Sequence, residues 1–136
     1  MLSLSSKSTY GLEALLDLAD HYGKELVQIK DIVERKRIPR NYLEQILNNL
    51  TKNRIIHGVR GKDGGYELTR SPDSITVLDV LEAVDGSIQL NDSKCITAIQ
   101  TLYKEVENKI KEGFRITLSD LLERQRNLES MINFQI

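Results

Sequence analysis

The feature that most constrains the fold is a β-hairpin signature that follows three helix-like segments. The segment IIHGVRGKDGGYELT spans residues 55–69 and places β-prone runs on both sides of the glycine-rich turn GKDGG. Glycine takes positive φ values at little steric cost, so this turn can reverse the chain within a few residues. We therefore expect a short hairpin whose tip carries Arg60 and Lys62.

Helices are expected on both sides of this hairpin, because apolar side chains recur there at steps of three and four residues. The expected helices cover residues 6–22, 28–36, 39–53 and 76–85. In the third of them, Pro39 is expected in the first turn, where proline fits best. Its buried stripe is expected to comprise Leu43, Ile46, Leu47 and Leu50.

A longer helix is expected over residues 95–112, and a last helix opens near Thr117. At ~1.5 Å per residue, the longer helix would measure roughly 27 Å, which is long for a domain of this size. Five apolar side chains follow the three-four spacing of a seam between paired helices: Ile96, Ile99, Tyr103, Val106 and Ile110. Such a seam is typical of a helix that packs along another helix.

The formal net charge of −1 conceals a basic centre. Residues 35–70 contain nine Lys or Arg and three Asp or Glu, whereas residues 1–34 and 71–136 are both acidic. A nucleic-acid backbone responds to local charge, so the basic centre matters more than the total. An ordinary solvated surface is the alternative, and charge alone favours that alternative.

The order of three helices and a basic hairpin is typical of a winged helix-turn-helix, in which one helix enters the major groove of DNA. The outer face of the third helix, near its N-terminus, carries four side chains of types that contact bases or phosphates: Arg40, Asn41, Glu44 and Gln45. Tyr42 is ambiguous, because its hydroxyl can reach a phosphate while its ring packs inward.

The hairpin tip adds a second set of contacts suited to DNA. Arg60 suits a narrow, negatively charged minor groove, and Lys62 and the backbone N–H of Gly61 suit phosphates. The helix and the hairpin together favour binding of double-stranded DNA over an ordinary charged surface.

Several stretches carry a more specific pattern. They are LSSKSTYGLEALLDLA, RNYLEQILNNLTKNRIIHGVRGKDGGYELT and ITVLDVLEAVDG, followed by CITAIQTLYKEVENKI and ITLSDLL. This pattern resembles the Rrf-two family of winged-helix transcription regulators over nearly the whole chain. The resemblance implies a mainly α protein with a small β-hairpin. Residues 1–86 would form a winged helix-turn-helix DNA-binding domain, and residues 87–94 a sensor-type loop. Residues 95–136 would form a dimerisation helix and a C-terminal helix that packs back on the core. The seam of the dimerisation helix would form the interface of a homodimer.

The resemblance also implies a function, namely a homodimeric transcriptional regulator, expected to be a repressor, on a palindromic operator. Carried over by position, the residues in the major groove would be Asn41, Tyr42, Glu44 and Gln45. Arg60 would enter the minor groove, and phosphates would be approached by Ser5, Lys7 and Gln28.

The single cysteine, Cys95, leaves the regulatory signal open. Many members of the resembled family hold an iron–sulfur cluster through three cysteines before the long helix, and Cys95 matches the last of them. The other two are absent, although clusters usually take four ligands. Glu13 matches a position from which some relatives supply a carboxylate. Cys95 therefore has three interpretations: an inert thiol, a redox-active thiol at a helix start, or a cluster ligand.

Nothing in the motifs indicates an enzyme. The chain has no P-loop, no HExxH and no GxSxG pattern, which are the signatures of several common catalytic sites. The alternative to a DNA-binding regulator is a dimeric protein-interaction module that keeps the winged-helix shape. No apolar stretch is long enough to span a membrane and no export signal is visible, so the expected location is the cytoplasm.

Overall fold

The apolar stripes of the first three helices face one shared core. The computed structural model describes residues 3–91, 94 and 96–135. These helices are α1 (Ser6–Asp20), α2 (Ile29–Lys36) and α3 (Arg40–Lys52). Leu15, Ile32 and Leu47 are each 0–1% exposed. Burial of such side chains contributes roughly 1.5–3 kcal/mol each, so packing rather than helix propensity holds these short helices together.

A tight turn joins α2 to α3. The C-cap residue of α2 is Arg37, whose backbone is left-handed with φ 54°. Ile38 then enters the core at 1% exposed, and Pro39 is the N-cap residue of α3. Pro39 was expected in the first helical turn and lies one position earlier, because its extended ψ of 131° delays the helix until Arg40.

The hairpin forms where the glycine-rich turn predicts it. Strand β1 (Ile56–Val59) pairs antiparallel with β2 (Gly65–Leu68). In this register Ile56 lies opposite Leu68, and both are buried at 1% and 3% exposed. Only the base of the hairpin therefore belongs to the core, and its tip extends into solvent. An isolated two-stranded hairpin is only marginally stable, so this one needs an anchor.

The segment between α1 and α2 provides that anchor. The Val27 N–H donates to the Tyr66 carbonyl at 3.0 Å, and the Tyr66 N–H donates to the Val27 carbonyl at 2.8 Å. The neighbouring Gly65 has φ 155°, and a Cβ atom there would lie 2.7 Å from the Val27 carbonyl oxygen. Glycine is therefore required both for this backbone conformation and for the close approach of the two segments.

An ion pair between a buried carboxylate and an exposed guanidinium ties α1 to α2. The carboxylate of Asp17, which is 4% exposed, accepts hydrogen bonds from the Arg35 guanidinium at 3.0–3.1 Å. The hydrogen bonds to Asp17 raise the pKa of Arg35 above its ordinary value. Because α2 leads directly into α3, this ion pair also helps to orient α3.

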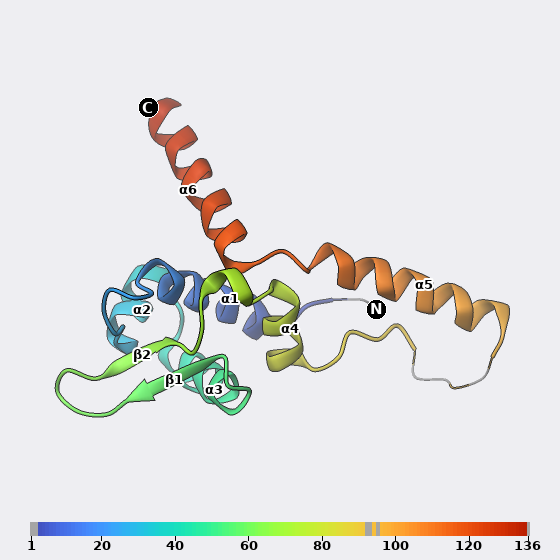
Figure 1. Ribbon diagram of the computed structural model, residues 1–136, viewed down its shortest axis with the longest axis horizontal. Coiled ribbons are helices and arrows are strands. Elements are labelled where there is room, and N and C mark those ends of the chain that lie inside the picture. The colour runs from blue at the N-terminus through green and yellow to red at the C-terminus, as the bar shows by residue number, and fades with distance from the viewer. Residues whose placement is uncertain (1–2, 92–93, 95, 136) are drawn as a thin grey trace.

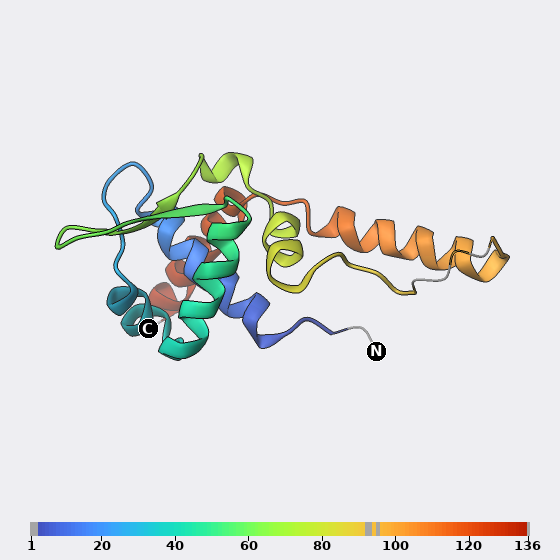
Figure 2. The same cartoon turned by 90° about the horizontal axis from the view of Figure 1, so that it is seen from below.

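The remaining elements complete the body and then leave it. A 3-10 turn, η1 (Pro72–Ser74), precedes α4 (Val77–Asp85), which begins with a capping box between Thr76 and Asp79. The last two helices are α5 (Ala98–Gly113) and α6 (Leu118–Gln135). Figure 1 shows both of these projecting from the body in different directions. In Figure 2 the hairpin tip and α5 lie at opposite ends of the molecule.

The helix α5 begins three residues later than its apolar spacing predicts. The Thr97 side chain accepts a hydrogen bond from the Gln100 N–H at 3.1 Å and caps the helix. Ile96, 98% exposed, therefore precedes α5 and is not part of the helical seam. The first backbone N–H groups of a helix have no acceptor within the helix. A side-chain cap pairs one of them, and so fixes where the helix begins.

The C-terminal helix α6 contacts the core through its first half. Leu118 is fully buried, and the Arg126 guanidinium donates to the Asp20 carboxylate at 2.7 Å. Farther along, Leu128, Met131 and Ile132 are 55–59% exposed. The apolar end of the chain thus stays in contact with solvent in the protomer. Within the described residues, no helix combines the length and the apolar character needed to cross a bilayer.

The close approach at Gly65 leads to a stability prediction. Gly65→Ala places a Cβ against the Val27 carbonyl oxygen in a backbone conformation that alanine rarely adopts. We expect the free energy of unfolding in urea to fall by about 1–3 kcal/mol. Gly113→Ala is the control, because no atom lies within 4 Å of its added Cβ. Equal stability of the two variants would show that the anchor does not constrain the hairpin.

Candidate nucleic-acid interface

One face of α3 is exposed because the opposite face fills the core. The four buried side chains are those expected from the sequence: Leu43, Ile46, Leu47 and Leu50. Four polar side chains consequently line the exposed side at helical spacing: Asn41, Glu44, Gln45 and Asn48. Amide and carboxylate groups of this kind can form hydrogen bonds with base edges in a major groove.

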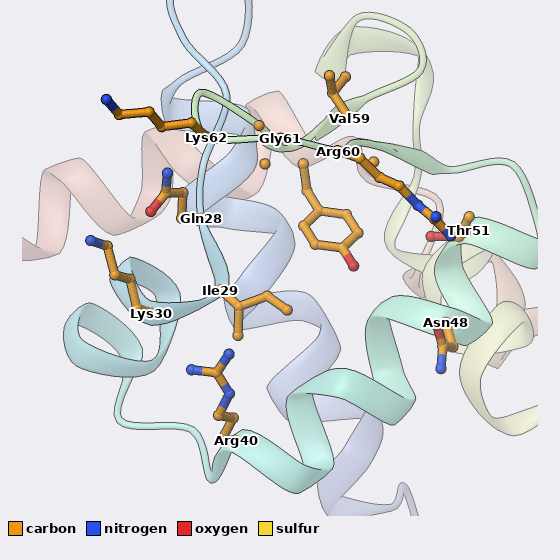
Figure 3. Close-up of a pocket in the computed structure, with 14 residues that line it drawn as sticks. Gln28, Ile29, Lys30, Arg40, Asn48, Thr51, Val59, Arg60, Gly61 and Lys62 are labelled. Carbon is orange, nitrogen blue, oxygen red and sulfur yellow. The ribbon is translucent and has the colours of Figure 1, made fainter.

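A groove of about 670 Å³ lies between α3 and the hairpin. The start of α2 contributes Gln28, Ile29 and Lys30, and α3 contributes Arg40, Asn48 and Thr51. The hairpin contributes residues 58–62 and 64–66. Figure 3 shows the Arg60 side chain extending toward Thr51 of α3, whereas Lys62 points the other way, beyond Gln28. Three elements that are separate in sequence thus border one concave surface.

The groove is positively charged. Among the described residues that line it, four are basic and none is acidic: Lys30, Arg40, Arg60 and Lys62. Clustered cations on a concave surface attract a polyanion even when the net charge of the protein is near zero. Arg40, Arg60 and Lys62 from the basic centre expected from the sequence therefore line the groove, and Lys30 from outside that stretch joins them.

Arg40 also contacts its own helix. Its Nε lies 3.2 Å from the Glu44 carboxylate, and the two side chains are 59% and 52% exposed. Exposed pairs of this kind contribute at most about 1 kcal/mol, so exchange of the carboxylate for a phosphate costs little. Arg40 can therefore contact DNA while Glu44 is released toward the bases.

The start of α1 reaches the N-terminal end of α3. The Lys7 amine lies 5.9 Å from the centroid of the Tyr42 ring, and the Tyr10 and Tyr42 ring centroids are 6.3 Å apart. Tyr42 is 46% exposed, so its ring packs on one side while the residue still faces solvent. Lys7 thus stands beside the exposed face of α3.

Two other residues expected near phosphates differ in their surroundings. Gln28 is the N-cap residue of α2, and its side chain lines the groove. The Ser5 side chain instead caps α1 by accepting from the Ser8 N–H at 3.2 Å, and its hydroxyl donates to Asp85 at 2.6 Å. The Ser5 hydroxyl is thus already hydrogen-bonded within the protein, where its oxygen caps the start of α1.

Sequence reasoning missed several residues that line the groove, among them Lys30, Asn48 and Thr51. Asn48 follows the same spacing as Asn41 and Gln45, so the helical period of α3 could have revealed it. Lys30 and Thr51 carry no such signal, because their place depends on how α2 and the hairpin dock against α3.

The candidate metal ligands do not fit an iron–sulfur cluster. Cys95 lies outside the described residues, and the chain supplies one thiol in total. The Glu13 carboxylate lies 3.7 Å from the Lys36 amine and so has a cationic partner. Within the described part of the chain, no three His, Cys, Asp or Glu side chains are grouped as metal ligands. Clusters usually take four ligands, so the single thiol of Cys95 does not hold one unaided.

The predicted seam on α5 is partly exposed. Ile99, Tyr103 and Val106 are 61%, 38% and 37% exposed, and Leu102 beside them is 54% exposed. Ile110 is half-buried and lines a separate pocket of about 360 Å³ near the end of α4. The central part of the seam therefore faces solvent in the protomer. The predicted seam is shorter than expected, because Ile96 precedes the helix and Ile110 is half-buried in a separate pocket.

A buried carboxylate on α5, Glu107, holds the linker from α4. The Leu90 N–H donates to the Glu107 carboxylate at 3.1 Å, and the Lys104 amine lies 3.2 Å from the same carboxylate. Burial raises the pKa of Glu107, but its hydrogen bonds with Lys104 and Leu90 outweigh that effect and leave the pKa below its ordinary value. Glu107 thus remains ionised and fastens the linker along the helix.

Comparison with known proteins agrees with this geometry. The Rrf2 family model, described as an iron-dependent transcriptional regulator, matches residues 4–124. The HTH-type transcriptional regulator IscR of Sodalis glossinidius is 34% identical over 139 residues, which cover 94% of this chain and 83% of that relative.

Two solved structures show the same fold. The T. potens IscR structure is 35% identical with a TM-score of 0.77 and covers 91% of this chain and 88% of its own. CymR, the global cysteine regulator of B. subtilis, is 30% identical with a TM-score of 0.80 and covers 91% of this chain and 98% of its own. The chain therefore belongs to the Rrf2 family, and it is a winged-helix DNA-binding transcriptional regulator rather than an enzyme.

Proposed function

We propose that this regulator binds a palindromic operator as a homodimer and represses transcription from it. Each protomer places α3 in the major groove and the hairpin in the flanking minor groove. The observation that carries this proposal is the basic groove between α3 and the hairpin, because one duplex can contact both of its walls. Repression follows if the bound dimer excludes polymerase from the promoter, and its DNA partner places the protein in the cytoplasm.

Base and phosphate contacts divide between the elements of this surface. Asn41, Glu44 and Gln45 face away from the core and are placed to meet base edges. Lys7 and Gln28 border this face and are placed to meet phosphates, whereas the hairpin offers Arg60 to the minor groove. Base contacts specify the sequence, while phosphate contacts fix the position of the protein on the duplex.

A second copy of the chain is the proposed partner of α5. Ile99, Leu102 and Val106 are large apolar side chains exposed on a helix that projects from the body (Figure 1). Exposed apolar patches of this kind mark association surfaces. At ~1.5 Å per residue, the 16 residues of α5 span about 24 Å, which is enough for several turns of contact between two copies.

The sequence also left open a dimeric interaction module without affinity for DNA, and membership of a family of transcriptional regulators argues against that module. Fluorescence anisotropy of a mixed-sequence duplex over a series of salt concentrations separates the two functions. DNA binding predicts that the logarithm of affinity falls linearly with the logarithm of salt, by about 0.9 for each phosphate contact. Absence of salt-dependent binding would favour the interaction module.

The hairpin assignment predicts the effect of Arg60→Ala. On a duplex selected by the wild-type protein from a random pool, we expect binding to weaken by about 1–3 kcal/mol. Thermal stability should stay nearly unchanged, because Arg60 is exposed. Arg124→Ala is the matched control, since Arg124 is exposed on α6 and does not line the groove. Normal affinity of Arg60→Ala would contradict a minor-groove role.

The α3 assignment predicts that Gln45→Ala loses discrimination more than total affinity. Binding to the selected duplex should weaken, whereas binding to a scrambled duplex should change little, because a base contact carries the sequence information. Lys30→Ala gives the contrast, since loss of a phosphate contact should weaken both complexes about equally. A uniform loss for Gln45→Ala would place that side chain on the backbone instead.

The dimer assignment predicts that Ile99→Glu combined with Val106→Glu yields monomers. Each substitution introduces a carboxylate at a side chain that we propose to be buried between two copies, where an unpaired charge is costly. Sedimentation velocity should show the monomer, while circular dichroism should show a folded body, since both side chains are already exposed in the protomer. Glu105→Gln, on an exposed site of the same helix, should remain dimeric. A dimeric double variant would exclude this face of α5.

A further inference from the structure

One carboxylate outside the groove gathers three hydrogen bonds from the start of α1. Asp85, the last residue of α4, accepts from the Ser5 N–H at 3.2 Å and from the Ser5 hydroxyl at 2.6 Å. The Ser8 hydroxyl donates to the same carboxylate, and Ser8 is 0% exposed. We refer to Ser5, Ser8 and Asp85 as the N-terminal clamp.

The clamp determines where α1 begins. Ser5 is the N-cap residue of α1, and its side-chain oxygen accepts from the Ser8 N–H at 3.2 Å while its hydroxyl donates to Asp85. The Asp85 carboxylate therefore orients the cap itself. Without it, the buried Ser8 hydroxyl would lose its acceptor, which costs free energy whenever a polar group is enclosed away from water. The first turn of α1 would then lose its connection to α4.

Lys7 lies inside this turn, between the two serines of the clamp. Its amine stands 5.9 Å from the ring of Tyr42, which is on the exposed side of α3. The position of the Lys7 amine relative to the DNA-facing helix thus depends on how the turn is held. None of the three clamp residues lines the groove.

The Asp85 carboxylate is ionised at neutral pH. Burial raises its pKa, but the hydrogen bonds from Ser5 and Ser8 and the charge of Lys7 outweigh that effect and lower the pKa below the ordinary value. A permanent negative charge near a surface that binds phosphates is electrostatically unfavourable for binding. The Asp85 carboxylate favours DNA binding overall if ordering the turn strengthens binding more than the repulsion between the carboxylate and DNA weakens it.

We propose that Asp85 is a positioning residue for DNA binding: through Ser5 and Ser8 it holds the first turn of α1 so that Lys7 meets a phosphate beside the α3 contact. This inference rests on the proposed function. For the removal of Asp85, this inference predicts the opposite change in DNA affinity to the one that charge alone predicts. Removing a negative charge near DNA should tighten binding, whereas losing the position of Lys7 should weaken binding.

The test compares Asp85→Ala, Lys7→Ala and the double variant on a mixed-sequence duplex over a series of salt concentrations. Lys7→Ala should lower the salt slope by about 0.9 per bound protomer, which corresponds to a roughly fivefold to tenfold loss of affinity at moderate salt. Asp85→Ala should lower the slope by a similar amount. The double variant should show no further loss, because both changes remove the same phosphate contact.

Asp79→Ala is the matched control, because it removes the same charge and a capping interaction from the other end of α4. It should lower thermal stability without changing the salt slope. If Asp85→Ala fails to fold, Ser8→Ala tests the same connection with only one hydroxyl removed. We expect this variant to lower the salt slope in the same direction.

Several results would overturn the inference while leaving the proposed function intact. They are an unchanged slope or tighter binding for Asp85→Ala, an unchanged slope for Lys7→Ala, or additive losses in the double variant. Salt-independent or absent binding by the wild-type protein would instead overturn the proposed function. The salt slope is decisive because a merely structural role of Asp85 would lower stability without removing a phosphate contact.

Discussion

The two backbone hydrogen bonds between Val27 and Tyr66 set the geometry on which the DNA-facing surface depends. A two-stranded hairpin has too few internal contacts to hold its own position. Docking β2 against the segment between α1 and α2 gives it a third partner and places its tip across a groove from α3. The close approach explains why Gly65 stands at that point, since any side chain would meet the Val27 backbone.

The charge of the surface is local rather than global. The protein has a net charge of −1, yet four basic and no acidic residues line the described groove. At physiological ionic strength, charges act over roughly 8–10 Å, so acidic side chains farther than this from the groove do little to cancel its field. The groove is therefore basic because α2, α3 and the hairpin converge, and not because the chain is basic.

The projecting helices give the protomer a shape that suits association. The body buries the apolar faces of α1 to α4, whereas α5 and the end of α6 keep large apolar side chains in contact with solvent. The linker between α4 and α5 is held along the helix by Glu107, while Ile99, Leu102 and Val106 stay exposed. A second copy packed on these side chains would remove this apolar surface from water.

Sequence alone determined the elements of this protein, because each depends on neighbours within a few residues. The buried stripe of α3 follows from Leu43, Ile46 and Leu47 at helical spacing, and the hairpin turn follows from clustered glycines. The family also followed from contiguous motifs. Local patterns were less reliable at helix ends, where a single cap such as Thr97 decides which residue begins the helix.

Only the tertiary structure decided how these elements share contacts. Nothing near Lys30 or Thr51 in the sequence indicates that both line one groove, because that depends on the docking of the hairpin. The same holds for Ser5 and Asp85, which are 80 positions apart and meet through the packing of α1 on α4. Local periodicity reports which side of a helix is apolar, whereas the partner of a polar side chain is fixed by the packing of distant segments.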